Sequence, residues 1–361
     1  MARTPPVKLA QFIDRVRDGL SWLRDKLVPP HLAALEYVNG LWAFQIVYVV
    51  AELGVADLLR DGPRSAEQMA ESCGVDADAL YRLLRGATAV GLFRELDGKR
   101  FELDRLGRTL CEDAPASARG FILFQGRIGW QHWGELLNCV RKDTNAIDLL
   151  HGMETFDYMG SDPDIAETFR AAMTSATSLL VDPLVAAYDF STAERIVDVG
   201  GGRGLLLAKI LESAPEAHGV LFELPDAVSG ARTYLDDQEL GPRSEVVGGD
   251  FFDATSIPEG DLYVLKAIIH DWDDETAGQI LSNIREVMPS NARVLLCEAL
   301  LPDANESHLA KLTDIEMLVH SDGGRERTAE EYRQLLASAD LKMTRVVPTA
   351  APYSIVEAML S

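Results

Sequence analysis

The sequence predicts an α/β fold, with an open and mostly parallel sheet in its second half and a mostly helical region before it. Two patterns support this prediction. From residue 194 onward, short apolar runs alternate with helix-like segments, as in parallel sheets covered by helices on both faces. Over residues 64–110, a helix, a turn and a second helix precede two short strand-like runs, which is the outline of a winged helix. The 361 residues suffice for two domains.

The beginning of the chain is predicted to be helical up to about residue 60. From Ala33 to Leu59, apolar residues occur on nearly every face of the expected helix, so this segment must be buried on more than one side. A partner subunit would supply such burial in a region this small. We therefore hypothesise that the segment contributes to a homodimer interface.

The winged-helix prediction depends on Asp97-Gly98, a strong hairpin signal between two strand-like runs. The helix from Asp76 to Gly86 takes the place of a recognition helix. Between Arg60 and Arg108, however, nine basic residues are balanced by nine acidic ones. Because DNA binding requires a positive surface, the charge balance favours a structural or dimer-forming role for this module.

The overall composition restricts the partners further. Lys plus Arg number 34 and Asp plus Glu number 57, which gives a formal net charge of −23. Such an acidic chain is not expected to bind nucleic acid or an anionic membrane. The four cysteines are scattered and form no CxxC pair, which disfavours both a disulfide framework and a structural zinc site.

The N-terminal sequence alternates charged and apolar residues and lacks the continuous apolar segment of a signal peptide. The most apolar stretch, residues 41–51, is far shorter than the about 20 residues that span a bilayer. We therefore expect a protein of the cytoplasm.

Further elements follow from local patterns. Residues 115–185 are expected to be helical, with Asp182-Pro183 ending the stretch. A helix is expected from Thr328, because Thr-Ala-Glu-Glu fits a capping box with Glu331. The other expected helices are 204–215, 227–240 and 273–288, and the expected strands are 195–199, 219–224, 244–250, 261–269, 293–301, 341–349 and 353–360.

A glycine-rich loop, VDVGGGRG at 197–204, joins the first strand of the sheet to its first helix. Glycines at this edge let the backbone approach a ligand beside the helix N-terminus. The spacing is G-x-G-x-G rather than the G-x-G-x-x-G of dinucleotide sites, which disfavours NAD and FAD. Glu223 ends the next strand, where a carboxylate can accept both hydroxyls of a ribose.

This loop, together with Glu223, GDFF at 249–252 and LKAIIHDW at 265–272, resembles the class I S-adenosylmethionine-dependent O-methyltransferases. More narrowly, it is similar to the branch of plant caffeate-type enzymes and bacterial enzymes that methylate aromatic polyketides and antibiotics. The resemblance implies a Rossmann-like methyltransferase domain with a seven-stranded, mostly parallel sheet, preceded by a winged-helix dimerisation domain. The expected domains are 1–115 for dimerisation, 116–185 for a helical linker that forms part of the acceptor pocket, and 186–361 for methyl transfer.

The resemblance also implies S-adenosylmethionine as cofactor, with S-adenosylhomocysteine as product. Gly200 and Gly202 would face the methionine part, and Glu223 would hold the ribose hydroxyls. Asp250, Phe251 and Trp272 would contact the adenine. Lys266 matches a family lysine near the cofactor.

His270 is the predicted general base. A phenol has a pKa near about 10 and is a poor nucleophile at neutral pH, whereas a neutral imidazole with a pKa near about 6.5 can take its proton. The alternative is that His270 only caps the helix after Asp273 and Asp274. Glu298, a charge ending an apolar strand, requires a partner, and His270 is the obvious one.

The family resemblance implies further site residues. Glu326 in GGRERT matches a second catalytic Glu, which would orient His270 together with Glu298. Acceptor contacts are expected at Phe169, Met173, Met317, His320 and Asp271, with Trp130 as a weaker candidate. Ser321 stands where plant members often have Asn, which argues against a simple phenylpropanoid acceptor. We see no Mg²⁺ ligand set and expect no metal.

The function predicted is transfer of a methyl group to a hydroxyl of a small aromatic molecule. N-methylation of an aromatic nitrogen is the nearest alternative, because a ring nitrogen need not lose a proton to a base. A non-catalytic regulator that binds the cofactor is a further alternative. A serine hydrolase is disfavoured, because no G-x-S-x-G motif is present.

Overall fold

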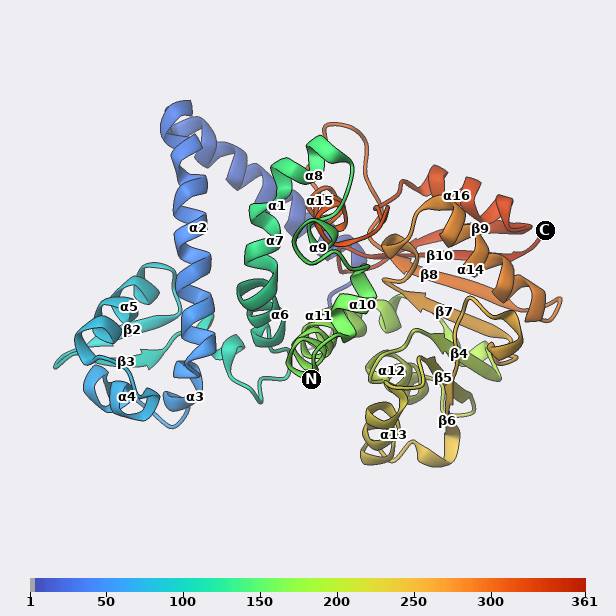
Figure 1. Cartoon of the computed structure of the whole chain (residues 1–361), viewed down its shortest axis with the longest axis horizontal. Helices are drawn as coiled ribbons and strands as arrows, with labels where there is room; N and C mark the ends of the chain where they lie inside the picture. The colour runs from blue at the N-terminus through green and yellow to red at the C-terminus, as the bar shows by residue number, and fades with distance from the viewer. Residues whose placement is uncertain (1–3) are drawn as a thin grey trace. The chain divides into compact units, whose positions relative to one another are not determined.

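The computed structural model describes residues 4–361 (Figure 1). The chain divides into two compact units. One unit comprises residues 16–131 and 164–179, and the other comprises residues 132–163 and 180–361 with the segment up to residue 15. The expected domain bounds at 115 and 185 stay a prediction.

The first unit contains the predicted winged helix. Its small sheet has the order β1-β3-β2, and the two strands β2 and β3 form the antiparallel hairpin expected at Asp97-Gly98. Gly98 and Lys99 both have positive φ, as the tight turn requires. Asp76 caps the expected helix by accepting the N–H of Ala79. The elements are α2 (Pro30–Glu52), α3 (Val55–Leu58), β1 (Arg64–Ser65), α4 (Ala66–Cys73), α5 (Ala77–Ala89), β2 (Phe93–Leu96), β3 (Arg100–Leu103), η1 (Gly107–Leu110), α6 (Arg119–Phe124) and the π-helical turn η2 (Gln125–Gly129).

Helix α2 differs from its sequence-based description. It has 23 residues and is long and apolar enough, by length and composition, to cross a membrane, so the expectation of a stretch too short to span is wrong. The reason is that the apolar pattern extends N-terminally through Leu32 and Leu35 to Pro30. Only Val50 and Ala51 of this helix are buried within the chain.

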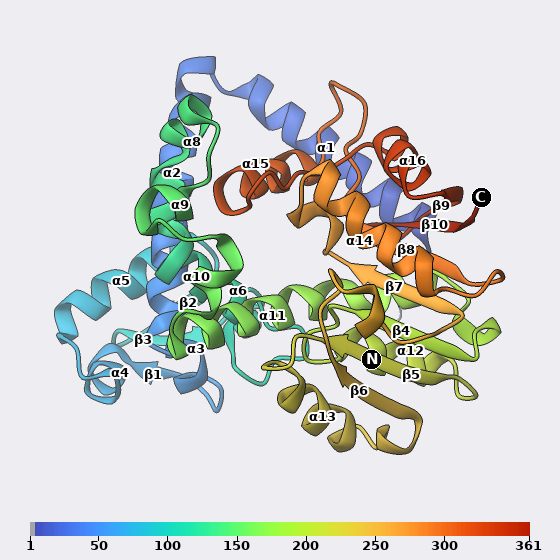
Figure 2. The ribbon, with the colours of Figure 1, turned by 45° about the vertical axis from the view of Figure 1, so that its right-hand side comes forward.

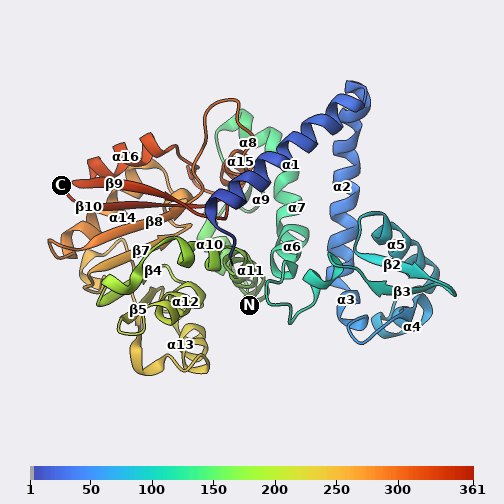
Figure 3. The ribbon, with the colours of Figure 1, turned by 180° about the vertical axis from the view of Figure 1, so that it is seen from behind.

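The second unit contains a seven-stranded sheet of order β6-β5-β4-β7-β8-β10-β9, which confirms the predicted fold class. The strands are parallel except β10, which is antiparallel to both β8 and β9 (Figure 3). The strands are β4 (Arg195–Val199), β5 (His218–Glu223), β6 (Ser244–Gly248), β7 (Leu262–Lys266), β8 (Arg293–Glu298), β9 (Leu341–Pro348) and β10 (Ser354–Leu360).

Both faces of this sheet are covered by helices, which explains why its strands are apolar throughout (Figure 2). Val197 and Val199 of β4 pack toward α14 and α16, whereas Ile196 between them packs toward α12 and α13. The helices are α12 (Leu205–Ser213), α13 (Val228–Asp237), α14 (Asp274–Val287), α15 (Ala310–His320) and α16 (Ala329–Ser338), and the shorter segments are η3 (Phe190–Thr192), η4 (Gly241–Arg243), η5 (Ala254–Ser256) and η6 (Ile269–Asp271).

Several expected bounds are wrong, and the strand expected over 293–301, for example, ends at Glu298. The strand expected over 261–269 ends at Lys266, because Ala267 adopts a left-handed backbone that turns the chain. The helix expected to end at Asp182-Pro183 continues to Ala187, since one proline removes a single helical hydrogen bond and the flanking residues still pack. The remaining helices are α1 (Val7–Leu27), α7 (Trp130–Gly134), α8 (Leu136–Lys142), α9 (Ala146–His151), α10 (Thr155–Gly160) and α11 (Pro163–Ala187).

Candidate active site

The glycine-rich loop follows β4 and leads into α12. Gly200, Gly202 and Gly204 all have positive φ, a conformation that other residues adopt only under strain. Glu223 is tied to this loop, because its Oε2 accepts the N–H of Gly202 at 2.9 Å. A Cβ added to Gly202 would meet no atom within 4 Å, so the loop backbone is accessible there.

Asp198 is a site residue that the sequence reasoning missed. It lies in β4 just before the loop and is 1% exposed, and its Oδ2 has no hydrogen-bond partner among the described residues. Burial raises the pKa of Asp198 to about 7. The sequence contains a signal for it, namely a charged residue inside an otherwise apolar strand. Burying such a charge costs free energy unless a hydrogen bond or an opposite charge compensates it.

The residues expected near the adenine lie close to one another. The Phe251 ring lies edge-on to Trp272 at 6.1 Å, and Phe252 is 5.1 Å from the same Trp272 ring. Asp250 is exposed, and its Oδ1 accepts the N–H of Phe252 at 2.9 Å. Phe156 stacks on Trp272 at 5.4 Å, a neighbour that the sequence did not indicate.

The turn after β7 carries His270. Ala267 has φ +53°, which for a residue other than glycine costs about 1–2 kcal/mol. This turn directs the N–H groups of Ile268 and Ile269 onto Oε1 of Glu298, at 3.3 and 3.0 Å. A Cβ at Gly200 would lie 2.6 Å from Ile268 Cδ1, so the glycine loop packs directly against the turn.

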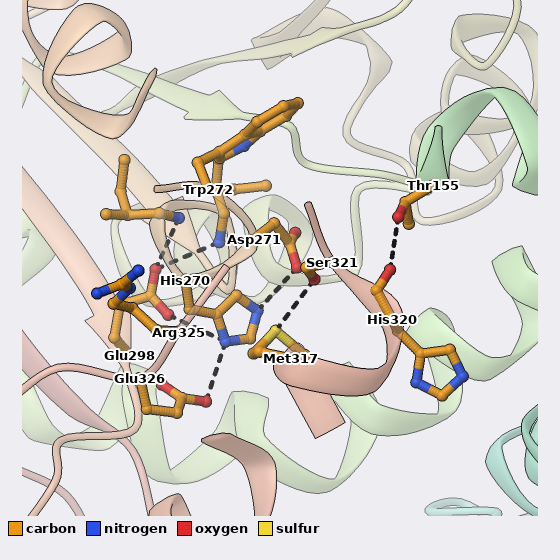
Figure 4. Close-up of polar contacts among 12 residues, drawn as sticks. Thr155, His270, Asp271, Trp272, Glu298, Met317, His320, Ser321, Arg325 and Glu326 are labelled. Carbon is orange, nitrogen blue, oxygen red and sulfur yellow. Dashed lines mark hydrogen bonds and ion pairs between the residues drawn. The ribbon is translucent and has the colours of Figure 1, made fainter. Parts of the chain in front are cut away.

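His270 is held among three carboxylates (Figure 4). Its Nδ1 is 3.1 Å from Oε1 of Glu326 and 3.8 Å from Oε2 of Glu298. Its Nε2 is 3.5 Å from Oδ1 of Asp271. The hydrogen bond is thus made to Glu326, while Glu298 bonds the backbone and contributes its charge.

Burial and charge act in opposite directions on this cluster. Burial lowers the pKa of His270, but the negative charges of Asp271, Glu298 and Glu326 outweigh it and raise the pKa to about 10. Burial raises the pKa of Glu298 to about 7 and also raises that of Asp271. Burial lowers the pKa of Lys266, although the negative charges of Glu298 and Asp198 act to raise it. The carboxylates therefore hold the pKa of His270 above the ordinary imidazole value of about 6.5.

The alternative role of His270 as a helix cap does not match the contacts. Glu326, which contacts His270 Nδ1, is 2% exposed. The cap of α14 is Asp273, which accepts the N–H of Thr276 at 2.8 Å, rather than His270. Asp274 is paired with Arg327.

The expected acceptor contacts are distributed over both units. Met317 and Ser321 lie beside His270, with Ser321 Oγ 3.6 Å from Met317 Sδ (Figure 4). The His320 ring points away from His270 and is 3.2 Å from Glu316, as measured from Nδ1 to Oε1. Phe169, Met173 and Trp130 belong to the other unit, where Phe169 lies 5.9 Å from Phe124 and Trp130 lies 6.0 Å from Phe44. Their roles stay predictions.

No ion was expected from the sequence, and the described residues contain one group of side chains with the spacing of metal ligands. His270, Glu298 and Glu326 each offer a ligand atom within 4.8 Å of the others, the one such group among the described residues. Asp273 and Asp274 are engaged elsewhere in the contacts given above.

Comparison with known proteins identifies the family. The profile of the O-methyltransferase domain matches residues 133–342, and that of the O-methyltransferase dimerisation domain matches residues 35–113. The phenazine O-methyltransferase PhzM of Lysobacter antibioticus is 36% identical over 92% of this chain and 96% of that relative. The 8-amino-8-demethylriboflavin N,N-dimethyltransferase of Streptomyces davaonensis is 34% identical over 86% and 90%, respectively. The chain belongs to the O-methyltransferase family, as its motifs predicted.

Solved structures extend this result to the cofactor. The crystal structure of LaPhzM matches with a TM-score of 0.89 at 36% identity, over 92% of this chain and all of that one. Human N-acetylserotonin methyltransferase in complex with S-adenosylmethionine matches with a TM-score of 0.86 at 27% identity, over 92% and 98%. The cofactor of this chain is S-adenosylmethionine, which confirms the prediction.

The residues around the glycine loop fit this cofactor. S-adenosylmethionine carries positive charges on its sulfur and its amino group, and two ribose hydroxyls that donate hydrogen bonds. The unpaired Oδ2 of Asp198 and the carboxylate of Glu223 are acceptors at the loop. Gly202 leaves the backbone open to the methionine part, and Phe251 with Trp272 presents an aromatic surface to adenine.

Proposed function

We propose that the chain methylates a hydroxyl of a small aromatic molecule, with His270 as general base. The observation that carries the proposal is the 3.1 Å contact between His270 Nδ1 and the buried Glu326. A carboxylate at this position holds the proton on Nδ1 and leaves Nε2 as the basic atom.

The proposed reaction requires little of the protein beyond alignment and one proton acceptor. When bound, S-adenosylmethionine supplies a methyl group on a positively charged sulfur. His270 Nε2 takes the hydroxyl proton of the acceptor as its oxygen bonds to the methyl carbon and the carbon–sulfur bond breaks. The raised pKa of His270, about 10, is close to that of a phenol, so the proton transfer is nearly balanced. Glu298 and Glu326 stabilise the imidazolium that forms.

N-methylation is the second candidate, and one observation favours it. The relative from Streptomyces davaonensis that is 34% identical methylates an amino nitrogen, according to its name. An aromatic amine loses its proton more readily after methyl transfer, so it does not depend on a strong base in the same way. His270 and its two buried carboxylates are more readily explained by a hydroxyl acceptor.

The test is an assay with labelled S-adenosylmethionine against matched phenols and aromatic amines, in the presence of a chelator. For His270→Ala, we expect transfer to phenols to fall about 100- to 10,000-fold. Binding of S-adenosylhomocysteine, measured by calorimetry, should stay within about twofold. Phenol turnover that is unchanged in the variant would falsify the base assignment. A wild-type enzyme that methylates only amines would establish the second candidate instead.

The active form is proposed to be a homodimer of the cytoplasm. The match to a dimerisation domain supports the dimer, as do the large apolar side chains that α2 exposes, which include Leu35, Tyr37 and Trp42 at 59%, 85% and 60%. A partner subunit covering these side chains accounts for the membrane-like composition of α2. Light scattering at low concentration should give twice the chain mass, and a monomer mass would contradict the proposal.

A further inference from the structure

Arg327 follows Glu326 directly but does not pair with it. The side chain is 1% exposed, and its Nη1 donates to the carbonyl of Ile269 at 3.1 Å. Nη2 donates to the carbonyl of Trp272 at 2.8 Å. One planar group thus bonds both ends of the turn that contains His270.

The same guanidinium is anchored on its remaining sides. Its Nε donates to Oδ1 of Asp274 at 2.8 Å, and its carbon lies 5.9 Å from the centre of the buried Tyr332 ring. A buried charge is tolerated only when its hydrogen bonds are made, and here they are made mainly to main-chain carbonyls. The orientation of the guanidinium is therefore fixed, and with it the position of the turn.

The residues before Glu326 hold the turn in the same way. The N–H of Arg325 donates to the carbonyl of His270 at 2.8 Å. A Cβ at Gly324 would lie 2.7 Å from the carbonyl oxygens of both His270 and Asp271, so only glycine allows this approach. Gly323 pairs with Trp272 as an isolated bridge. Residues 323–327 are thus fitted around residues 269–272 through the main chain.

We propose that Arg327 is a positioning residue for catalysis, whose guanidinium fixes the turn 269–272 against the Glu326 segment. The function of this arrangement is to keep His270 Nδ1 at hydrogen-bond distance from Glu326. The proposal rests on the base role proposed above for His270. Lysine cannot replace the group, because a single ammonium lacks the planar fork that reaches two carbonyls at once.

The experiment compares Arg327→Lys with the wild-type full-length protein. We expect kcat to fall about 10- to 100-fold, because a displacement of the base by about 1 Å is enough for such a loss. The dissociation constant for S-adenosylhomocysteine should change less than about twofold. By NMR of labelled histidine, the pKa of His270 should move down from its raised value toward about 6.5, since Glu326 no longer faces it.

Arg243→Lys is the matched control. Its guanidinium also bonds main-chain carbonyls, those of Leu211, Ala214 and Ala217, at the end of α12 that is remote from the glycine loop. A loss of stability from replacing such an arginine is expected in both variants. A fall in kcat and a shift in the His270 pKa are expected only in Arg327→Lys.

Asp274→Ala keeps the proposal falsifiable if Arg327→Lys does not fold. Asp274 is largely exposed, and its Oδ1 contacts both Nε and Nη2 of Arg327. Its removal leaves the bonds of the guanidinium to the carbonyls of Ile269 and Trp272 in place. We expect a fall in kcat of about threefold and a smaller shift of the His270 pKa in the same direction. Unchanged kcat and unchanged His270 pKa in the folded variants overturn the positioning role. Full activity of His270→Ala would instead overturn the base assignment, so the two failures are distinguishable.

Discussion

The two halves of the active site are built differently, although both lie at the carboxyl end of the same sheet. On the cofactor side, Asp250 is exposed and the backbone at Gly202 is open, and Asp198, just before the glycine loop, is the buried exception. The groups around His270 are buried, with Glu298 and Glu326 at 0% and 2% exposure. A cofactor that exchanges in every cycle needs groups it can reach, whereas a base that acts in every cycle benefits from being aligned in advance.

The largest expected loss of activity comes from substitutions in the buried half of the site, around His270. In Glu326→Gln, the amide can donate to Nδ1 of His270 and so favour the tautomer that carries its proton on Nε2. We expect kcat to fall about 100- to 10,000-fold, as when the orienting carboxylate of a catalytic triad is neutralised. Cofactor affinity should be unchanged, as measured by calorimetry.

Glu298→Gln is the companion variant for this prediction. The carbonyl of Gln can still accept the N–H groups of Ile268 and Ile269, which Oε1 of Glu298 accepts at present. Its loss of kcat should therefore be at least about tenfold smaller than that of Glu326→Gln. Equal losses in the two variants would mean that charge, rather than the hydrogen bond to Nδ1, decides the rate.

The next largest effect is expected from pH. Because the pKa of His270 is raised to about 10, the imidazole is mostly protonated at pH 7 and loses its proton as the pH rises. The value of kcat/KM, which reports the free enzyme, should increase about 100-fold between pH 7 and 9. A profile that levels off near pH 7 would show that the three carboxylates do not hold the proton on His270.

The smallest effect is expected at the accessible half. Glu223→Ala removes the acceptor of the Gly202 N–H and the proposed partner of the ribose. The dissociation constant for S-adenosylhomocysteine should rise about tenfold, while kcat at saturating cofactor stays within about twofold. Glu212→Ala, an exposed carboxylate paired with Lys209 at the far end of α12, should leave both values unchanged. A large loss of kcat in Glu223→Ala would contradict the conclusion that the two halves have separate roles in cofactor binding and in catalysis.

Much of this architecture could be predicted from local patterns. Apolar strands between helices indicate a parallel sheet, and the chain has one. The capping box at Thr328 was also predicted, because its residues and their spacing are sufficient to define it, and both of its hydrogen bonds are present. Glu298 could be singled out because a charge at the end of an apolar strand needs a partner.

The supports of His270 could not be found in this way. GGRERT has the composition of an exposed loop, and nothing local shows that Glu326 and Arg327 are both buried. Glu326 was identified only through the family resemblance, and Arg327 not at all. The bonds that bury them run to residues more than 50 positions away, a separation at which periodicity carries no information.

The contacts around residues 269–272 have an evolutionary consequence. Arg325 and Arg327 bind this turn through carbonyl oxygens, and Gly324 approaches it with no side chain. These bonds do not depend on which side chains occupy positions 317 and 321, which lie beside His270. Mutations at these positions can change which acceptor binds without displacing His270 from its supports. New specificities can therefore arise while the chemical step is conserved.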